Sequence, residues 1–307
     1  MDSASDPERA LGAFAALVTS VTWAFASARY ATAARDAGGV RVNLVRAAVA
    51  SLGWGAALLA LEGPRSLVSV NSPQLLLLAG SIACSYGIGD NVFFAAARRL
   101  GVATALAVAT VYPLWAALFG VLFRAEPLGA TRALGLMLCL GGVTGLLVQS
   151  RTSAPDAAAG GGPKALAGVG LALLASLFWA GNAVCLKLGG EGLSVYLTNA
   201  LRFSLGTLML LAQLPFERSQ RADPAPSLPH LTRTLWVALL ADAGLGSVCY
   251  TYGIVHSDLA LGATLSSLSP LVSLPIAALS GTERITPVKA LAVSVTVAGV
   301  VLLVLPG

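Results

Sequence analysis

The sequence predicts an all-α membrane protein: ten transmembrane helices arranged as two inverted five-helix repeats. Three observations support this fold. The chain is 56% hydrophobic and only 11% charged, whereas a soluble domain carries about a quarter charged residues. Its apolar runs have the length of a membrane-spanning helix, and its two halves repeat each other. Lipid is therefore the expected solvent for most of the surface.

The apolar runs number ten, and each is about 20 residues long, enough to cross a hydrocarbon core of about 30 Å. In the first half they cover 11–33, 40–61, 73–97, 101–123 and 128–149, and in the second 166–188, 194–215, 233–256, 259–281 and 286–306.

The domain organisation follows from the composition between these runs. We expect an N-terminal tail at 1–10, a first repeat at 11–150 and a second repeat at 166–307. The segment 151–165 between them is rich in glycine and proline and is expected to be a flexible linker.

The internal repeat is visible residue by residue. At a spacing of 156, Trp23-Ala24 returns as Trp179-Ala180 and Asn43…Arg46 as Asn199…Arg202. At a spacing of 157 the returning features are Gly87-x-Gly89 as Gly244-x-Gly246, Pro113 as Pro270 and Glu126 as Glu283. Five spans per repeat is an odd number, so the second copy enters the membrane from the opposite side. Such duplicated membrane proteins are commonly transporters whose solute site lies between the repeats.

Other function classes find no support in the sequence. The four cysteines lie in apolar runs without a CxxC pair, and no zinc spacing, P-loop or catalytic triad is present. We therefore expect no enzyme activity, no metal and no cofactor. The basic residues form no stripe, so no nucleic-acid partner is expected. The first ten residues lack the basic region of a signal peptide, so the first apolar run is expected to remain as a helix.

Two carboxylates stand near the middle of predicted spans and are candidates for proton coupling. They are Asp90 and Asp242, whose repeat mates are Ser247 and Ser85. Ionisable groups at membrane depth are costly and mark functional sites, and burial favours the neutral form of a carboxyl group. The alternative is a structural Asp that is bonded to a neighbouring polar residue.

Two arginines and two prolines also occur as repeat mates. Arg46 and Arg202 could bind a substrate carboxylate, but a symmetric pair suits a scaffold, and we favour a role in tying helices together.

Pro113 and Pro270 are predicted to bend their helices, either as a hinge or as a static kink.

Aromatic and amide side chains inside the spans are the candidate substrate-binding residues, because lipid cannot satisfy their polar groups. The set is Trp23, Trp179, Asn182, Asn43, Asn199, Tyr86, Asn91 and Tyr250. For the two indoles, space filling is the alternative to stacking on a solute.

The repeated motifs resemble the EamA family of the drug/metabolite transporter superfamily. The resemblance rests on the Trp-Ala opening of each repeat, on Arg202-Phe203, and on small residues followed by a proline and a closing glutamate in 103–126 and 260–283. The chain departs from the family pattern in two ways: Tyr112 and Ser269 precede the prolines where the family commonly has glutamate, and Pro127 follows Glu126 where the family usually has arginine. The resemblance implies ten helices around a central cavity and export of small metabolites such as amino acids.

The orientation in the membrane has two opposing indications. Loops after odd-numbered spans carry eleven Lys or Arg against five on the other side, which places both termini outside by the positive-inside rule. The family resemblance implies termini in the cytoplasm, so the orientation stays open.

Together these observations predict a secondary transporter of the bacterial plasma membrane, with a small-molecule substrate and the lipid bilayer as its partners. It is expected to export amino acids or related metabolites by alternating access, either coupled to protons or as an uncoupled facilitator. Sugars, nucleotides and drugs are the alternative substrates.

Overall fold

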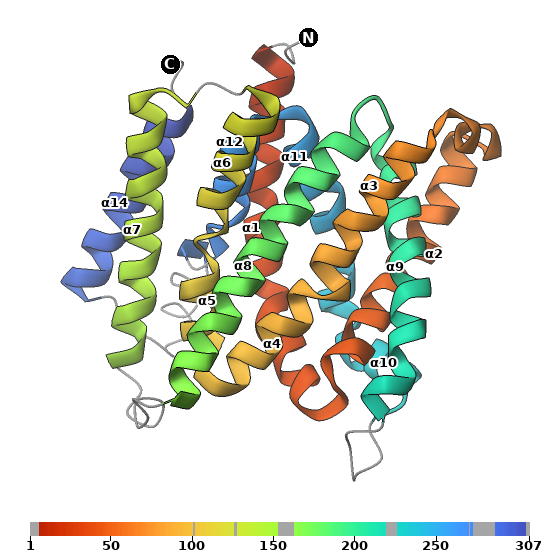
Figure 1. Cartoon of the computed structure of the whole chain (residues 1–307), viewed down its shortest axis with the longest axis horizontal. Helices are drawn as coiled ribbons and strands as arrows, with labels where there is room; N and C mark the ends of the chain where they lie inside the picture. The colour runs from red at the N-terminus through yellow and green to blue at the C-terminus, as the bar shows by residue number, and fades with distance from the viewer. Residues whose placement is uncertain are drawn as a thin grey trace.

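The computed structural model describes residues 6–100, 102–125, 128–152, 163–218, 226–269, 271–272 and 286–304. Within these residues every regular element is helical (Figure 1). Six helices are long and apolar enough to cross a membrane: Pro7–Ala37, Gly39–Leu61, Ser72–Leu100, Leu166–Gly190, Val195–Glu217 and Leu228–His256. Shorter apolar helices cover Tyr112–Phe123, Ala130–Gly145 and Ala290–Leu303.

The first half contains α1 (Asp6–Ala37), α2 (Gly39–Leu61), a short 3₁₀ turn η1 (Pro64–Ser69), α3 (Ser72–Ile82), a π-helical turn η2 (Ala83–Gly87), α4 (Gly89–Leu100), α5 (Val102–Ala109), α6 (Tyr112–Arg124) and α7 (Ala130–Thr152). The second half contains α8 (Pro163–Gly190), α9 (Val195–Arg218), α10 (Leu228–Ala238), a π-helical turn η4 (Leu239–Gly246), α11 (Ser247–His256), α12 (Leu259–Ser266) and α14 (Pro287–Val304). Most of the predicted linker lies outside the described residues.

Local sequence signals explain several helix boundaries. Gly38 separates α1 from α2 at a φ of 94°, a conformation that glycine adopts without a steric penalty. Asn71 opens α3 with a capping box: its side chain accepts from the Gln74 backbone N–H at 2.8 Å, and the Gln74 side chain accepts from the Asn71 N–H at 3.2 Å. Ser227 caps the start of α10 with a single hydrogen bond, accepted by its side chain from the His230 backbone N–H at 3.4 Å.

The third and eighth predicted spans are each interrupted by a π-helical turn at nearly equivalent positions. These turns are η2 and η4, and they contain Ser85, Tyr86 and Asp242. A π-helical turn inside an α-helix commonly marks a functional site, because it redirects side chains and loosens the backbone hydrogen-bond ladder. Asp90 follows directly in the first turn of α4.

The run predicted as one span at 101–123 is not one continuous helix: the structure has two helices, α5 and α6, with a break at Thr110 and Val111. Pro113 therefore lies in the first turn of α6, where its missing N–H costs nothing. It does not bend a continuous helix. Its repeat mate Pro270 lies outside the described residues, and a hinge role for either proline stays a prediction.

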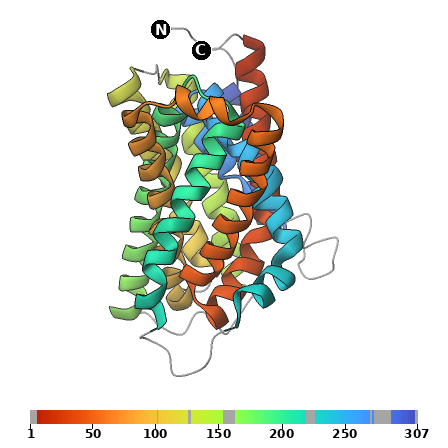
Figure 2. The same cartoon turned by 90° about the vertical axis from the view of Figure 1, so that its right-hand side faces the viewer.

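Equivalent elements of the two halves pack against each other. At one side of the molecule α7 packs on α14, and at the other α2 packs on α9 (Figure 1). Between them α1 packs on η4 and α11, and α8 packs correspondingly on α3 and α4. α1 begins beside the N-terminus at the top of Figure 1, whereas α8 begins at the bottom. In Figure 2 the long helices run side by side along one direction.

Ion pairs join the halves at the end of the molecule where α1 begins. Asp258, just before α12, pairs with Arg9 of α1, and Arg132 of α7 approaches the same carboxylate oxygen at 3.1 Å. Lys187 near the end of α8 donates to the backbone carbonyl of Ser257 at 2.6 Å. Carbonyls at the end of a helix lack an intrahelical partner, so Lys187 stabilises the end of α11.

Candidate functional site

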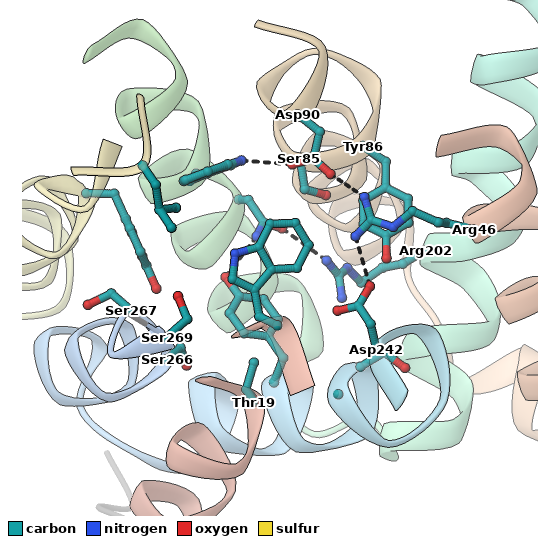
Figure 3. A pocket seen from close by; sticks show the side chains of 18 of the residues that line it. Thr19, Arg46, Ser85, Tyr86, Asp90, Arg202, Asp242, Ser266, Ser267 and Ser269 are labelled. Carbon is teal, nitrogen blue, oxygen red and sulfur yellow. Dashed lines mark hydrogen bonds and ion pairs between the residues drawn. The ribbon is translucent and has the colours of Figure 1, made fainter. Parts of the chain in front are cut away.

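A cavity of about 140 Å³ lies between the two halves. A water molecule needs about 10–15 Å³ on this measure, so the cavity accommodates roughly ten waters or a small solute. It is lined by side chains from both halves, many of them shown in Figure 3: Thr19, Trp23, Arg46, Ser85, Tyr86, Asp90, Leu106, Thr110, Tyr112, Trp179, Asn182, Arg202, Phe203, Asp242, Ser247, Tyr250, Ser266, Ser267 and Ser269. Trp23, Trp179 and Asp242 each stand near the midpoint of their helical segment.

Arg46 is the centre of the charged part of the cavity wall. Its guanidinium bonds to Asp90 at 2.6 Å and to Asp242 at 3.0 Å (Figure 3). It also donates to the Asn43 side chain at 2.8 Å, and it is only 2% exposed. The planar fork of an arginine suits two carboxylates at once, and a buried carboxylate without a partner would be costly. Arg46 thus links α2 to α4 of its own half and to η4 of the other half.

Aromatic rings surround the same guanidinium. The Arg46 Cζ atom lies 3.9 Å from the Tyr86 ring centroid, 4.3 Å from that of Tyr30 and 5.3 Å from that of Trp23. These distances fall within the range of cation–π attraction. The Trp179 indole N–H donates to the second oxygen of Asp90 at 3.0 Å. Two carboxylates and three aromatic faces therefore form one cation-binding environment.

Among the described residues, the hydrogen-bond partners of Arg202, the repeat mate of Arg46, are all neutral. Its guanidinium donates to Ser81 at 3.0 Å, to Asn182 at 3.0 Å and to Thr251 at 3.4 Å. No ion pair to Arg202 is present in the part of the chain that the structure describes. Asn182 in turn donates to the Tyr250 hydroxyl at 2.8 Å. Arg202 is 3% exposed and lines the cavity, so its charge is available to an anionic group.

Hydroxyl groups form the wall opposite the arginines, as Figure 3 shows for Ser266, Ser267 and Ser269. The Ser266 hydroxyl is buried and has no hydrogen-bond partner among the described residues. Sequence reasoning missed this wall. The signal was present, because three serines within four positions of an apolar run need partners that lipid cannot provide.

The structure brings most of the predicted site residues to this one cavity: Trp23, Trp179, Asn182, Tyr86, Tyr250, Asp90, Asp242, Arg46 and Arg202. Three predicted substrate-binding residues do not line it. Asn43 bonds to the Tyr86 backbone carbonyl at 3.0 Å, and Asn199 accepts from Thr251 at 2.7 Å, both behind the wall. Asn91 lines a separate crevice next to Arg35 and Glu217.

Comparison with known proteins identifies the family. The model of the EamA-like transporter family matches residues 10–148 and again 166–305. The crystal structure of another protein, 19% identical in sequence, superposes on this chain with a TM-score of 0.72. The match covers 97% of this chain and 98% of the other chain. That protein shares the fold. No curated protein matches the sequence. The two family matches together cover most of the chain and confirm the resemblance read from its motifs. The chain belongs to the EamA-like transporter family and is an integral, multi-pass membrane protein.

Proposed function

We propose that this protein is a secondary transporter that exports a small metabolite, an amino acid or a related compound, by alternating access through the central cavity. The observation that carries the proposal is the cavity itself. It lies between the halves and is lined by Asp90, Asp242, Arg46 and Arg202, all buried. Charged groups at membrane depth face functional cavities, and transporters of repeated architecture place their sites between the repeats.

Alternating access requires two halves that can exchange conformations. We infer two inverted five-helix repeats from the span count and from the opposite starting ends of α1 and α8 in Figure 1. Rocking of one such repeat against the other opens the site to each side in turn. The two halves contact each other most extensively where α2 packs on α9 and where α7 packs on α14, and these are the contacts about which the halves would rock.

An amino acid matches the charges of the cavity. Its ammonium group fits the side of Asp90 and Asp242, and its carboxylate fits Arg202, whose partners are all neutral. Trp23, Trp179 and Tyr112 supply apolar and aromatic wall for a side chain: the Trp23 and Trp179 rings are 6.5 Å apart, and the Tyr112 and Trp179 rings 6.2 Å apart.

Transport in reconstituted liposomes tests this function and its coupling. We expect saturable efflux of at least one labelled amino acid, reduced about tenfold or more in Asp242→Asn, since hydrogen bonds to charged groups are the strong ones. Asp36→Asn, an exposed position at the end of α1, is the matched control and should transport normally.

An imposed pH gradient distinguishes the two forms of the proposal. Gradient-driven flux that disappears in Asp90→Asn or Asp242→Asn, while efflux down the substrate gradient persists in the same variant, would establish a proton antiporter. Equal flux at every pH in the wild type would establish a facilitator in which neither carboxylate couples transport to protons. Folded protein that moves no amino acid contradicts the substrate class and turns the search to sugars, nucleotides and drugs.

A further inference from the structure

We propose that Asp90 and Asp242, together with Tyr86, Tyr30 and Trp23, form a binding site for an organic cation. In this structure the Arg46 guanidinium, tethered to α2, occupies the site. In the alternate state of the transport cycle Arg46 leaves it. The inference rests on the proposed transport function and names the charge of the substrate group that enters this part of the cavity. The cationic group belongs to the class of ammonium and guanidinium ions.

The site has more acidic groups than Arg46 has charges. Two carboxyl groups face one guanidinium, so the site holds one more acidic group than Arg46 can pair with as a single charge. Arg46 also occupies the site imperfectly, because its Nε is buried and finds no partner among the described residues. A group that satisfies both carboxylates and the aromatic faces can therefore compete with Arg46.

The repeat mates reveal that the two arginines stand in different registers. By symmetry, Arg202 should face Ser85 and Ser247, the mates of Asp242 and Asp90. It bonds to Ser81 and Thr251 instead, which lie four residues from those positions on both helices. Four residues is about one helical turn. Arg202 is thus one turn away from the position that corresponds to that of Arg46.

The asparagines that accompany the arginines show the same asymmetry. Asn43 donates to the backbone carbonyl of Tyr86 at 3.0 Å. The equivalent carbonyl, that of Ala243, receives the Trp54 indole N–H at 3.0 Å. Asn199 consequently has a buried Nδ2 without a partner in the described part of the chain. The two halves hold two different arrangements of one motif.

Exchange of the two arrangements would move Arg46 away from its carboxylates. In the alternate state of a rocking inverted repeat, each half adopts the conformation of the other, and a shift of one helical turn is an established type of switching motion. Arg46 would then lie next to Ala238 and Phe94, the repeat mates of Ser81 and Thr251. The side chains of Ala238 and Phe94 have no hydrogen-bond acceptor. Asp90 and Asp242 would lose their cation, and a buried unpaired carboxylate is costly. An organic cation that enters the cavity would pair with these carboxylates in place of Arg46.

The test is equilibrium binding to the purified protein in detergent, followed by tryptophan fluorescence, because Trp23 and Trp179 line the cavity. The probes are phenethylammonium, the neutral phenethyl alcohol and the anionic 3-phenylpropionate, which share one apolar body. We expect saturable binding of the cation, tighter than that of the neutral probe by about tenfold or more. Asp242→Asn should weaken cation binding by a similar factor, whereas Asp36→Asn should not change it.

A variant that vacates the site should change the cation affinity in the direction opposite to that of Asp242→Asn. Arg46→Gln removes the tethered occupant, so cation affinity should rise and the cation should raise the thermal midpoint of the variant more than that of the wild type. Equal affinity for the cation and the neutral probe overturns the proposal. Wild-type cation affinity in Asp242→Asn overturns it as well. The Asp242→Asn measurement remains informative if Arg46→Gln fails to fold. Cation binding without flux in liposomes would leave the site standing and contradict transport. Amino acid flux without cation preference would contradict the site alone.

Discussion

Arg46→Gln is expected to lower the free energy of unfolding by about 3–5 kcal/mol, the cost of removing one partner from a buried ion pair. Asp90 and Asp242 both depend on this guanidinium, and both are nearly inaccessible to solvent. The substitution leaves two like charges facing each other in the cavity wall. Denaturant titration of the purified protein in detergent, followed by tryptophan fluorescence, measures the loss.

The matched control is Arg202→Gln. It removes an equally buried guanidinium whose partners are neutral, so the expected loss is smaller, about 1–3 kcal/mol. The triple variant Arg46→Gln, Asp90→Asn, Asp242→Asn should recover most of the stability that Arg46→Gln loses, because no unpaired charge remains. Equal losses for the two arginine variants, or a triple variant less stable than Arg46→Gln, would contradict the ion-pair account.

Gly299→Leu is expected to separate α7 from α14 and to destabilise the fold by about 3 kcal/mol or more, the upper end of overpacking costs. A Cβ atom at Gly299 would lie 2.6 Å from the Cys139 backbone nitrogen and 2.7 Å from the Gly135 backbone oxygen. Backbone atoms cannot yield as a flexible side chain can, so the helices themselves must move apart. Small residues at such interfaces allow helices in a membrane to approach closely.

Gly141→Leu provides the comparison on α7, the helix that packs against α14. Its Cβ would meet no atom within 4 Å, so the variant should unfold at nearly the wild-type denaturant concentration. If Gly299→Leu and Gly141→Leu unfold alike, the α7–α14 contact does not hold the halves together.

The duplication in the sequence predicts a large part of the fold. A spacing of 156 or 157 residues pairs Asn43 with Asn199 and Arg46 with Arg202, and the structure buries both pairs on packed helices, α2 and α9. Apolar runs predict the helices because length and composition decide whether a segment can cross a membrane. Hydropathy alone does not reveal the break between α5 and α6, since a continuous apolar run carries no periodicity that marks an interruption. Pro113 is the sequence signal for it, because a proline is tolerated in the first turn of a helix and not in its interior.

The charged cluster is less accessible to sequence reasoning. Asp90 and Asp242 are visible as carboxylates in apolar spans, but Asp242 meets Arg46 across 196 positions of the chain. That contact depends on how the halves pack. The repeated motif also treats Arg46 and Arg202 as equivalent, whereas the structure gives two carboxylates to one and none to the other among the residues described. The repeat mates of Asp90 and Asp242 are serines, so the sequence does show that Arg202 lacks their carboxylates. The contacts of Arg202 with Ser81 and Thr251, one helical turn away, depend on conformation and cannot be read from a repeated motif.

Access to Ser266 is the most direct test of the central claim that the cavity opens to each side of the membrane in turn. Ser266→Cys places a thiol where an unpartnered hydroxyl now lines the cavity, in a background whose four native cysteines are replaced. Membrane-impermeant thiol reagents are then added to either side of oriented vesicles, and labelling is measured with and without substrate. Alternating access predicts labelling from both sides, with substrate changing the ratio of the two rates. Labelling from one side only, unaffected by any transported substrate, would contradict the account.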